Sequence, residues 1–158
     1  MQIKEGTPVL LLRVNDFGQF KFIDEHEKCL MKQSSVWMLK AGRHLSDKSV
    51  RMIQDSGVII LKEQKKSGNR FALAYAKDIK QGRKQNEMST PEYYKELLND
   101  GFVLEGTWIE ITQIDILQEE TIQKIVLAKD QQKVIDVVGK TRAPILYCTV
   151  NCDVELSK

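Results

Sequence analysis

The sequence is poor in the features that secreted and membrane-embedded proteins need. It has only three cysteines, Cys29, Cys148 and Cys152. An odd and sparse set fits a reducing compartment better than a disulfide framework. No apolar run approaches the roughly 20 residues that span a bilayer. Residues 1–16 also lack the layout of a signal peptide, because an acidic residue and a proline precede a very short apolar run. We therefore expect a cytoplasmic protein without a membrane partner.

Recognisable catalytic motifs are also missing. There is no Gly-x-Ser-x-Gly elbow, and neither histidine stands beside a nucleophile. A Gly-rich phosphate loop is absent, since Gly6, Gly18 and Gly42 are isolated. The sequence gives catalysis no support and implies no cofactor.

A metal site is the functional alternative for the cysteines. Cys148 and Cys152 are four residues apart and could pair with His26 or His44. The tight paired spacing of structural zinc ligands is missing, so small buried apolar residues are the favoured interpretation. We expect no metal.

The remaining composition is that of an ordinary globular domain. The chain has 158 residues, of which 42% are hydrophobic and 29% are charged. A chain of this length can bury enough surface to fold without a disulfide or metal. We expect residues 1–158 to form one domain.

Charge is distributed unevenly along the chain. The net charge is +2, but residues 40–84 carry twelve basic and four acidic side chains, whereas residues 85–158 carry seven basic and thirteen acidic ones. A basic segment of this kind indicates a polyanionic partner, RNA or DNA. The alternative is a solvated basic surface. The candidate nucleic-acid-binding residues are Lys40, Arg43, Lys65, Lys66, Arg70, Arg83 and Lys84.

Hydrophobic periodicity predicts an α+β fold. Alternating or continuous apolar stretches indicate strands, and three- and four-residue spacing indicates helices. The first half of the chain is expected to form a strand (8–14), a helix (20–33), a strand (35–40), a short helix that begins at Ser46 and ends at Ser56 and Gly57, and a hairpin (58–62 and 70–79). A polar connector (80–90) then leads to a helix that starts at Pro91 and is capped by Ser89 or Thr90. A strand (107–117), one or two helices (120–138) and a strand (145–150) complete the expected order. The hairpin favours a curved mixed sheet or a partly open β-barrel flanked by helices.

Three aromatic residues are candidates for a ligand pocket. Trp37 and Trp108 lie in expected strands beside charged or polar neighbours, and Tyr75 lies in the basic hairpin. Their rings offer flat faces on which a base can stack. The alternative is that each ring is a core residue with one satisfied polar edge.

The order of segments resembles the PUA-like superfamily, and within it the EVE and related domains that read modified bases. The resemblance rests on four stretches. The first is an apolar strand (9–14) that leads through a helix to a Trp-bearing strand (36–40), and the second is a pair of core strands (56–61 and 70–77). The third is a late aromatic strand (106–115), and the fourth is a closing turn with Arg142 followed by the last strand (139–150). The usual Gly-Asp before the core strand is Ser56-Gly57 here.

The resemblance implies a domain that binds RNA or DNA and accommodates a flipped, modified base between aromatic walls. Trp37, Tyr75 and Trp108 would be those walls, and Arg43, Lys65, Lys66 and Arg70 would hold phosphates. Two other functions remain open. One is a small interaction or inhibitor protein that docks on a protein partner through its oppositely charged regions, and the other is a small nucleotide hydrolase.

Overall fold

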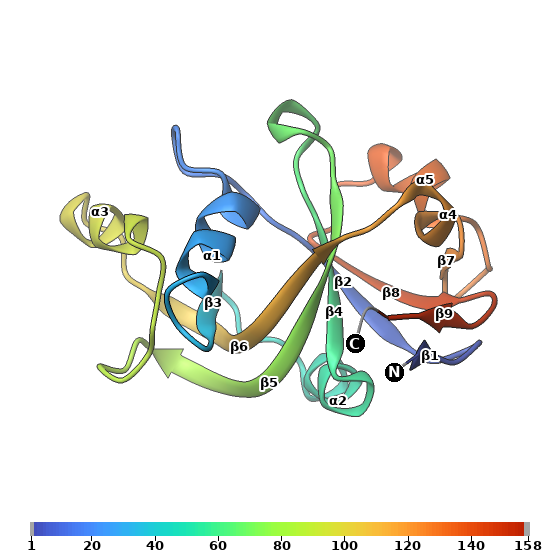
Figure 1. Ribbon diagram of the computed structural model, residues 1–158, viewed down its shortest axis with the longest axis horizontal. Coiled ribbons are helices and arrows are strands. Elements are labelled where there is room, and N and C mark those ends of the chain that lie inside the picture. Colours follow the sequence, from blue (N-terminus) through green and yellow to red (C-terminus); the bar gives the residue numbers. More distant parts are fainter. Residues whose placement is uncertain (1, 157–158) are drawn as a thin grey trace.

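A seven-stranded mixed sheet organises the protein, in a computed structural model that describes residues 2–156 (Figure 1). Its strands follow the order β3-β6-β5-β4-β2-β8-β7. Strands β2 and β4 are parallel, and the other neighbours are antiparallel. The strands are β2 (Val9–Arg13), β3 (Val36–Ala41), β4 (Val58–Lys62), β5 (Phe71–Arg83), β6 (Glu105–Ile116), β7 (Ile125–Leu127) and β8 (Ile145–Val150). A separate pair joins β1 (Gln2–Ile3) to β9 (Val154–Glu155).

The sheet is strongly curved but does not close into a barrel, since its end strands β3 and β7 do not pair with each other. Strands β5 and β6 form the long curved limb of the sheet (Figure 1). Their pairing register shifts on both sides of Ala76. Such bulges bend a strand and increase its local twist. The expectation of a mixed α+β sheet is therefore confirmed, and of its two expected forms the structure has the open, curved sheet (Figure 1).

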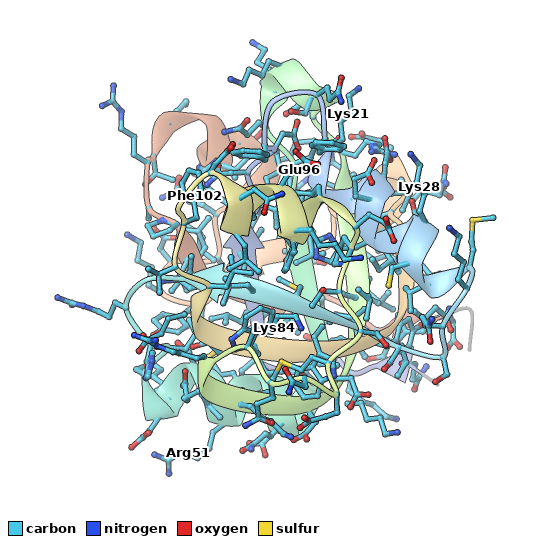
Figure 2. All side chains as sticks on the ribbon, turned by 90° about the vertical axis from the view of Figure 1, so that its left-hand side faces the viewer. Lys21, Lys28, Arg51, Lys84, Glu96 and Phe102 are labelled. Carbon is cyan, nitrogen blue, oxygen red and sulfur yellow. The ribbon has the colours of Figure 1, made fainter. Side chains whose placement is uncertain are left out.

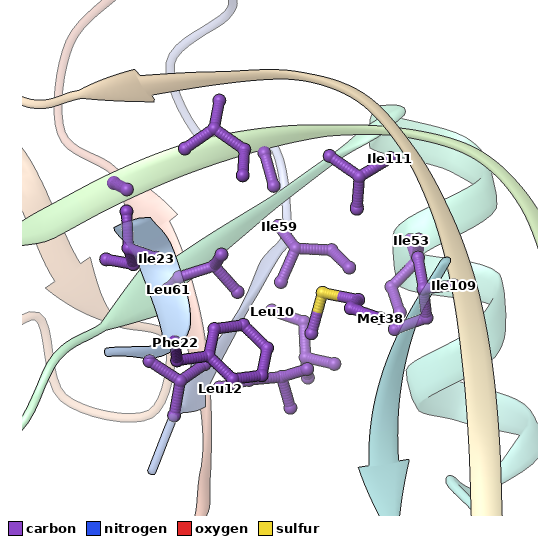
Figure 3. Packing of buried hydrophobic residues seen from close by; sticks show 14 of the residues in the cluster. Leu10, Leu12, Phe22, Ile23, Met38, Ile53, Ile59, Leu61, Ile109 and Ile111 are labelled. Atoms are coloured by element: carbon purple, nitrogen blue, oxygen red, sulfur yellow. The ribbon is translucent and has the colours of Figure 1, made fainter. Parts of the chain in front are cut away.

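The central strands are buried on both faces. Leu10 and Leu12 of β2 belong to one hydrophobic cluster, and Leu11 belongs to another on the opposite face. This split follows from the two-residue period of a strand. It confirms that the apolar run at the start of the chain is a strand covered on both sides. Figure 3 shows the first cluster, where Leu10 and Leu12 lie beside Ile59 and Leu61 of β4 and side chains from the helices.

Five short helices accompany the sheet. Helix α2 begins where the Ser46 side chain accepts a hydrogen bond from the Ser49 amide, and it ends at Gly57 in the left-handed region, with φ 73°. Both expected caps are thus confirmed. Helix α1 packs against β3 and β6, and α2 packs against β2, β4 and β5. The helices are α1 (Phe22–Leu30), α2 (Asp47–Ser56), α3 (Tyr93–Asn99), α4 (Glu119–Ile122) and α5 (Val134–Val137). None of the helices within residues 2–156 is long and apolar enough to cross a membrane.

The segment before α3 covers the open edge of β3. The amide of Trp37 donates to the Ser89 carbonyl at 2.8 Å, and the amide of Leu39 donates to the Tyr94 hydroxyl at 3.1 Å. Exposed edges invite pairing with other chains, so these two bonds protect the sheet. They also fix the position of α3 relative to β3.

Three sequence expectations were wrong. Residues 80–83 continue β5 instead of starting a connector, because they pair with 105–108 of β6. Helix α3 starts at Tyr93 behind Glu92, with no side-chain cap from Ser89 or Thr90. The segment 120–138 contains β7 between two single-turn helices. A three-residue apolar run becomes a strand there because β8 supplies its partner, and periodicity cannot reveal that partner.

Candidate nucleic-acid interface

A cavity of about 370 Å³ lies between the end of β2, strand β3 and the segment that joins α3 to β6. We call it the aromatic cavity because five of its lining residues carry rings: Phe17, Phe22, Tyr93, Tyr94 and Phe102. Its polar lining residues are Arg13, Asn15, Asp16 and Lys40. A mostly apolar hollow with a few convergent polar groups is the usual form of a small-ligand site.

Asp16 organises the loop that forms one wall of this cavity. One of its carboxylate oxygens accepts a hydrogen bond from the Phe22 amide at 2.9 Å, which satisfies a free donor at the start of α1. The other oxygen accepts a hydrogen bond from the Ser67 hydroxyl. Phe17 and Phe20 exchange two backbone hydrogen bonds across a tight turn. These bonds fix the backbone at Phe17, whose ring meets that of Phe102 edge-on, with the ring centres 5.7 Å apart.

A buried histidine fixes the opposite wall. His26 Nδ1 lies 2.7 Å from the Phe22 carbonyl, which can only accept, so Nδ1 carries the proton. Nε2 therefore accepts a hydrogen bond from the Tyr94 hydroxyl at 3.0 Å. Burial lowers the pKa of His26 to about 4, and the ring is neutral near pH 7. His26 thus supports an aromatic wall, as a satisfied core residue.

Arg13 contributes charge to the cavity, while Nε and Nη2 of its guanidinium are bound to backbone carbonyls. Its guanidinium donates to the Ala143 carbonyl at 2.9 Å, to the Thr141 carbonyl at 2.8 Å and to the Val138 carbonyl. These bonds attach the segment before β8 to the end of β2. Lys40, in contrast, is half-exposed and makes one hydrogen bond, to the Arg43 carbonyl at 3.1 Å.

The expected basic residues fall into two groups, one near the ends of β3 and β5 and one in the β4–β5 turn. The strand-end group consists of Lys40, Arg43, Arg83 and Lys84. Lys40 lines the cavity, and the Lys84 amide donates to the carbonyl of Leu104, another lining residue. Among residues 2–156, Arg83 is the one member of this group with an ion pair, to Glu105 at 3.4 Å. Figure 2 views this side of the molecule, with Phe102 beside α3 and Lys84 below it.

The loop group consists of Lys65 and Lys66 in the β4–β5 turn, and both residues are exposed. This turn touches the cavity wall directly. The Gln64 side chain donates to the Asn15 side chain at 2.9 Å, and Ser67 is bound to Asp16. Within residues 2–156 neither lysine forms an ion pair. Their charge is therefore available to a ligand.

The charge of Arg70, in contrast, is already paired with two carboxylates. Its guanidinium contacts Glu63 and Asp24, each at 2.7 Å. Hydrogen bonds to these two carboxylates raise the pKa of Arg70 above its ordinary value. An arginine held by two acids is a structural link between the turn and α1, so it is poorly placed to hold a phosphate.

The structure does not bring Trp37, Tyr75 and Trp108 to one pocket. Trp108 is fully buried and donates its indole N–H to the Gly82 carbonyl at 3.1 Å. Trp37 is also buried, and both indoles pack in the cluster that holds Tyr93 and Tyr94. Tyr75 packs against a different cluster. The two tryptophans lie behind the wall of the aromatic cavity and do not form it.

Sequence reasoning missed the rings that line the cavity. The expected pocket residues were Trp37, Tyr75 and Trp108, and none of the lining rings was among them. Two dense groups of aromatic residues, at 17–22 and 93–102, were the available signal. Comparisons with protein-family models, with curated proteins and with solved structures found no match.

Proposed function

We propose that this protein is a non-catalytic nucleic-acid-binding module that receives one unpaired base in the aromatic cavity. The observation that carries the proposal is that this cavity has lysines without an ion pair, within the described residues, both in its lining and on the turn bound to its wall. Lys65 and Lys66 lie on the turn that is bound to Asn15 and Asp16 of the cavity wall, and Lys40 lines the cavity from β3. A strand could cross between these groups with its phosphates on the lysines and one base turned inward.

The size and lining of the cavity suit one base. About 370 Å³ lies at the lower end of the volume of small-ligand sites, which is about 300–1,000 Å³. Stacking on an aromatic ring contributes about 1–3 kcal/mol per base and tolerates different bases. Phe102 is 53% exposed and can meet a base entering from solvent. A base extruded from a strand costs a few kcal/mol, which stacking and edge hydrogen bonds offset.

The same features support a PUA-like assignment of the sheet, as part of this proposal. The mixed sheet carries its candidate site beside β3, the strand that contains Trp37, although the walls of the site are formed by other rings than the resemblance implied. The three free thiols agree with a protein of the cytoplasm.

The direct test is binding to short oligonucleotides that contain 2-aminopurine, whose fluorescence reports unstacking. We expect single-stranded RNA or DNA to bind at low salt, with a change in 2-aminopurine emission at one position of the strand. Phe102→Ala should weaken binding about ten-fold, consistent with the loss of one stacking contact. Leu98→Ala is the matched control, because Leu98 is 51% exposed at the end of α3, four residues before Phe102, but does not line the cavity. Undetectable binding of all oligonucleotides at low salt would refute the proposal.

A protein partner is the second candidate, and one observation favours it. Leu98, Phe102 and Val103 are 51%, 53% and 65% exposed within six residues of chain. Exposed apolar patches often mark protein interfaces. Stoichiometric co-purification with one protein, lost in Phe102→Ala and Leu98→Ala alike, would favour docking over base recognition.

Hydrolysis gains no support from this cavity. Asp16 is the sole carboxylate among its lining residues, and both of its oxygens are engaged by Phe22 and Ser67. A general base needs an oxygen that can reach the reacting proton.

A further inference from the structure

A second cavity, of about 570 Å³, lies on the β7–β8 side of the sheet and is larger than the aromatic cavity. Its apolar lining residues are Leu127, Ala128, Val137, Ile145 and Leu146. Its polar lining residues are Lys48, Lys129, Gln132, Lys140, Thr141 and Tyr147. We call it the lysine cavity. No residue of the aromatic cavity is shared with it.

The charged residues that line the lysine cavity are all basic. Lys48, Lys129 and Lys140 come from three different segments, and no carboxylate is among the lining residues. Within the described part of the chain none of the three lysines forms an ion pair. Asp130 is the acidic neighbour of Lys129, but its oxygens accept hydrogen bonds from the amide and side chain of Gln132. Three unpaired ammonium groups around one hollow favour an anion with more than one negative charge.

The walls of the lysine cavity are held in place by hydrogen bonds. The Ala128 amide donates to the Tyr147 carbonyl at 3.0 Å, and the Leu127 amide donates to the Gln132 carbonyl at 2.8 Å. Arg13 holds the carbonyl of Thr141 from below. A site with fixed walls loses less entropy when a ligand binds.

Tyr147 positions one of the cations. The Lys48 ammonium lies 4.4 Å from the centre of the Tyr147 ring, a cation–π contact. The Tyr147 hydroxyl lies 3.1 Å from the Ser49 hydroxyl, so both ends of this ring are anchored. This contact keeps the Lys48 ammonium at the cavity, although Lys48 is the sole lining residue that belongs to α2.

We propose that the lysine cavity binds a small organic phosphate, with the phosphoryl group among the three lysines and an apolar or aromatic body on the floor of the cavity. A phosphate dianion matches the charge of the rim and can also accept hydrogen bonds from Thr141 and Gln132. The apolar floor distinguishes this ligand from free inorganic phosphate. The site is separate from the proposed nucleic-acid interface and does not depend on it.

The test compares three probes: phenyl phosphate, inorganic phosphate and benzyl alcohol. Amide chemical shifts in ¹H–¹⁵N spectra and calorimetry follow each titration at low ionic strength. We expect phenyl phosphate to give saturable shifts at Ala128 and Tyr147, and to bind at least about ten-fold more tightly than either other probe. Lys129→Gln/Lys140→Gln should weaken phenyl phosphate by about ten-fold or more.

The matched control is Lys65→Gln/Lys66→Gln, which removes the same charge from the β4–β5 turn, away from the lysine cavity, and should leave phenyl phosphate binding unchanged. An equal loss in both double variants would show non-specific attraction and overturn the inference, as would the absence of saturable shifts. Displacement of a bound oligonucleotide by phenyl phosphate would also overturn it, since the two sites would then be one. If no oligonucleotide binds at all, the proposed function fails while the phenyl phosphate result stands.

Discussion

The carboxylate of Glu63 and the guanidinium of Arg70 meet in a two-point contact, with Nε 2.8 Å from Oε1 and Nη2 2.7 Å from Oε2. The Glu63 side chain is completely buried, whereas that of Arg70 is 32% exposed. The Arg70 amide also donates to Oε1 at 3.1 Å. This pair closes the β4–β5 turn, which carries Lys65 and Lys66 to the aromatic cavity.

Arg70→Gln should destabilise the protein because it leaves the buried Glu63 carboxylate without its main partner. We expect the free energy of unfolding in urea to fall by about 2–3 kcal/mol, less than for a fully buried pair since Arg70 is partly solvated. Glu63→Gln/Arg70→Gln should cost less than the sum of the single changes. Lys66→Gln, on the same turn, should stay within about 0.5 kcal/mol of the parent protein. Additive single effects would show that the contact is energetically unimportant.

His26 should make stability depend on pH. Its folded pKa is about 4 because burial disfavours the charged ring, and its ordinary value is 6.5. Below pH 6.5 the imidazole of His26 is protonated in the unfolded chain but stays neutral in the folded protein. The contribution of His26 to the free energy of unfolding is therefore fully present above pH 6.5 and is lost as the pH falls toward 4. The full loss is about 3 kcal/mol. Urea unfolding of His26→Asn should show a shallower decline over this window, and an unchanged decline would contradict the assignment.

Tyr94→Phe should cost about 1–3 kcal/mol, because His26 Nε2 and the Leu39 amide both lose their partner. Thermal unfolding measures the loss. Tyr147→Phe serves as a control for removing a phenolic hydroxyl, since Tyr147 is 37% exposed and its hydroxyl can be replaced by water. Equal losses of stability in the two variants would show that the hydrogen bonds of the buried Tyr94 hydroxyl stabilise the protein no more than those of an exposed one.

Gly106→Ala should prevent stable folding. A Cβ at position 106 would lie 2.1 Å from the backbone oxygen of Lys40, where β3 and β6 pair. Backbone atoms cannot move aside cheaply, and we expect a loss of at least about 3 kcal/mol. Gly82→Ala is the matched control: Gly82 also has a positive φ and pairs with Gly106, but an added Cβ would meet no atom within 4 Å. Circular dichroism and urea unfolding separate the two, and a well-folded Gly106→Ala protein would contradict the geometry.

The salt dependence of oligonucleotide binding should identify the phosphate contacts. Lys65→Gln/Lys66→Gln should lower the slope of log K against log salt by about one to two, since each lost phosphate contact removes about 0.7–0.9. Arg70→Gln should leave the slope unchanged where the protein remains folded, because Arg70 is occupied by Glu63 and Asp24. Anisotropy titrations at several salt concentrations measure this. A slope reduced by Arg70→Gln alone would instead assign the phosphate contact to Arg70.

Local sequence signals predicted the parts of the fold that depend on local chemistry. The strand that contains Leu10 and Leu12 and the caps at Ser46 and Gly57 follow from apolar period and capping preference, and the structure has each of them. β7 was missed because its three residues become a strand only through β8. The basic character of residues 40–84 was visible, but not that Arg70 is already neutralised by Asp24, which lies 46 positions earlier in the chain.

The sequence by itself determined an α+β chain, with a basic middle segment and aromatic residues grouped at 17–22 and 93–102. Only the tertiary structure decided which rings face a cavity. Trp108 is enclosed behind Tyr94, while Phe17 and Phe102 reach the cavity from two distant loops. The physical reason is that composition and period report what a side chain prefers, whereas a site depends on which segments the sheet brings together. The distribution of charge along the chain likewise does not show which lysines are free to bind a ligand, because the fold decides which of them form ion pairs.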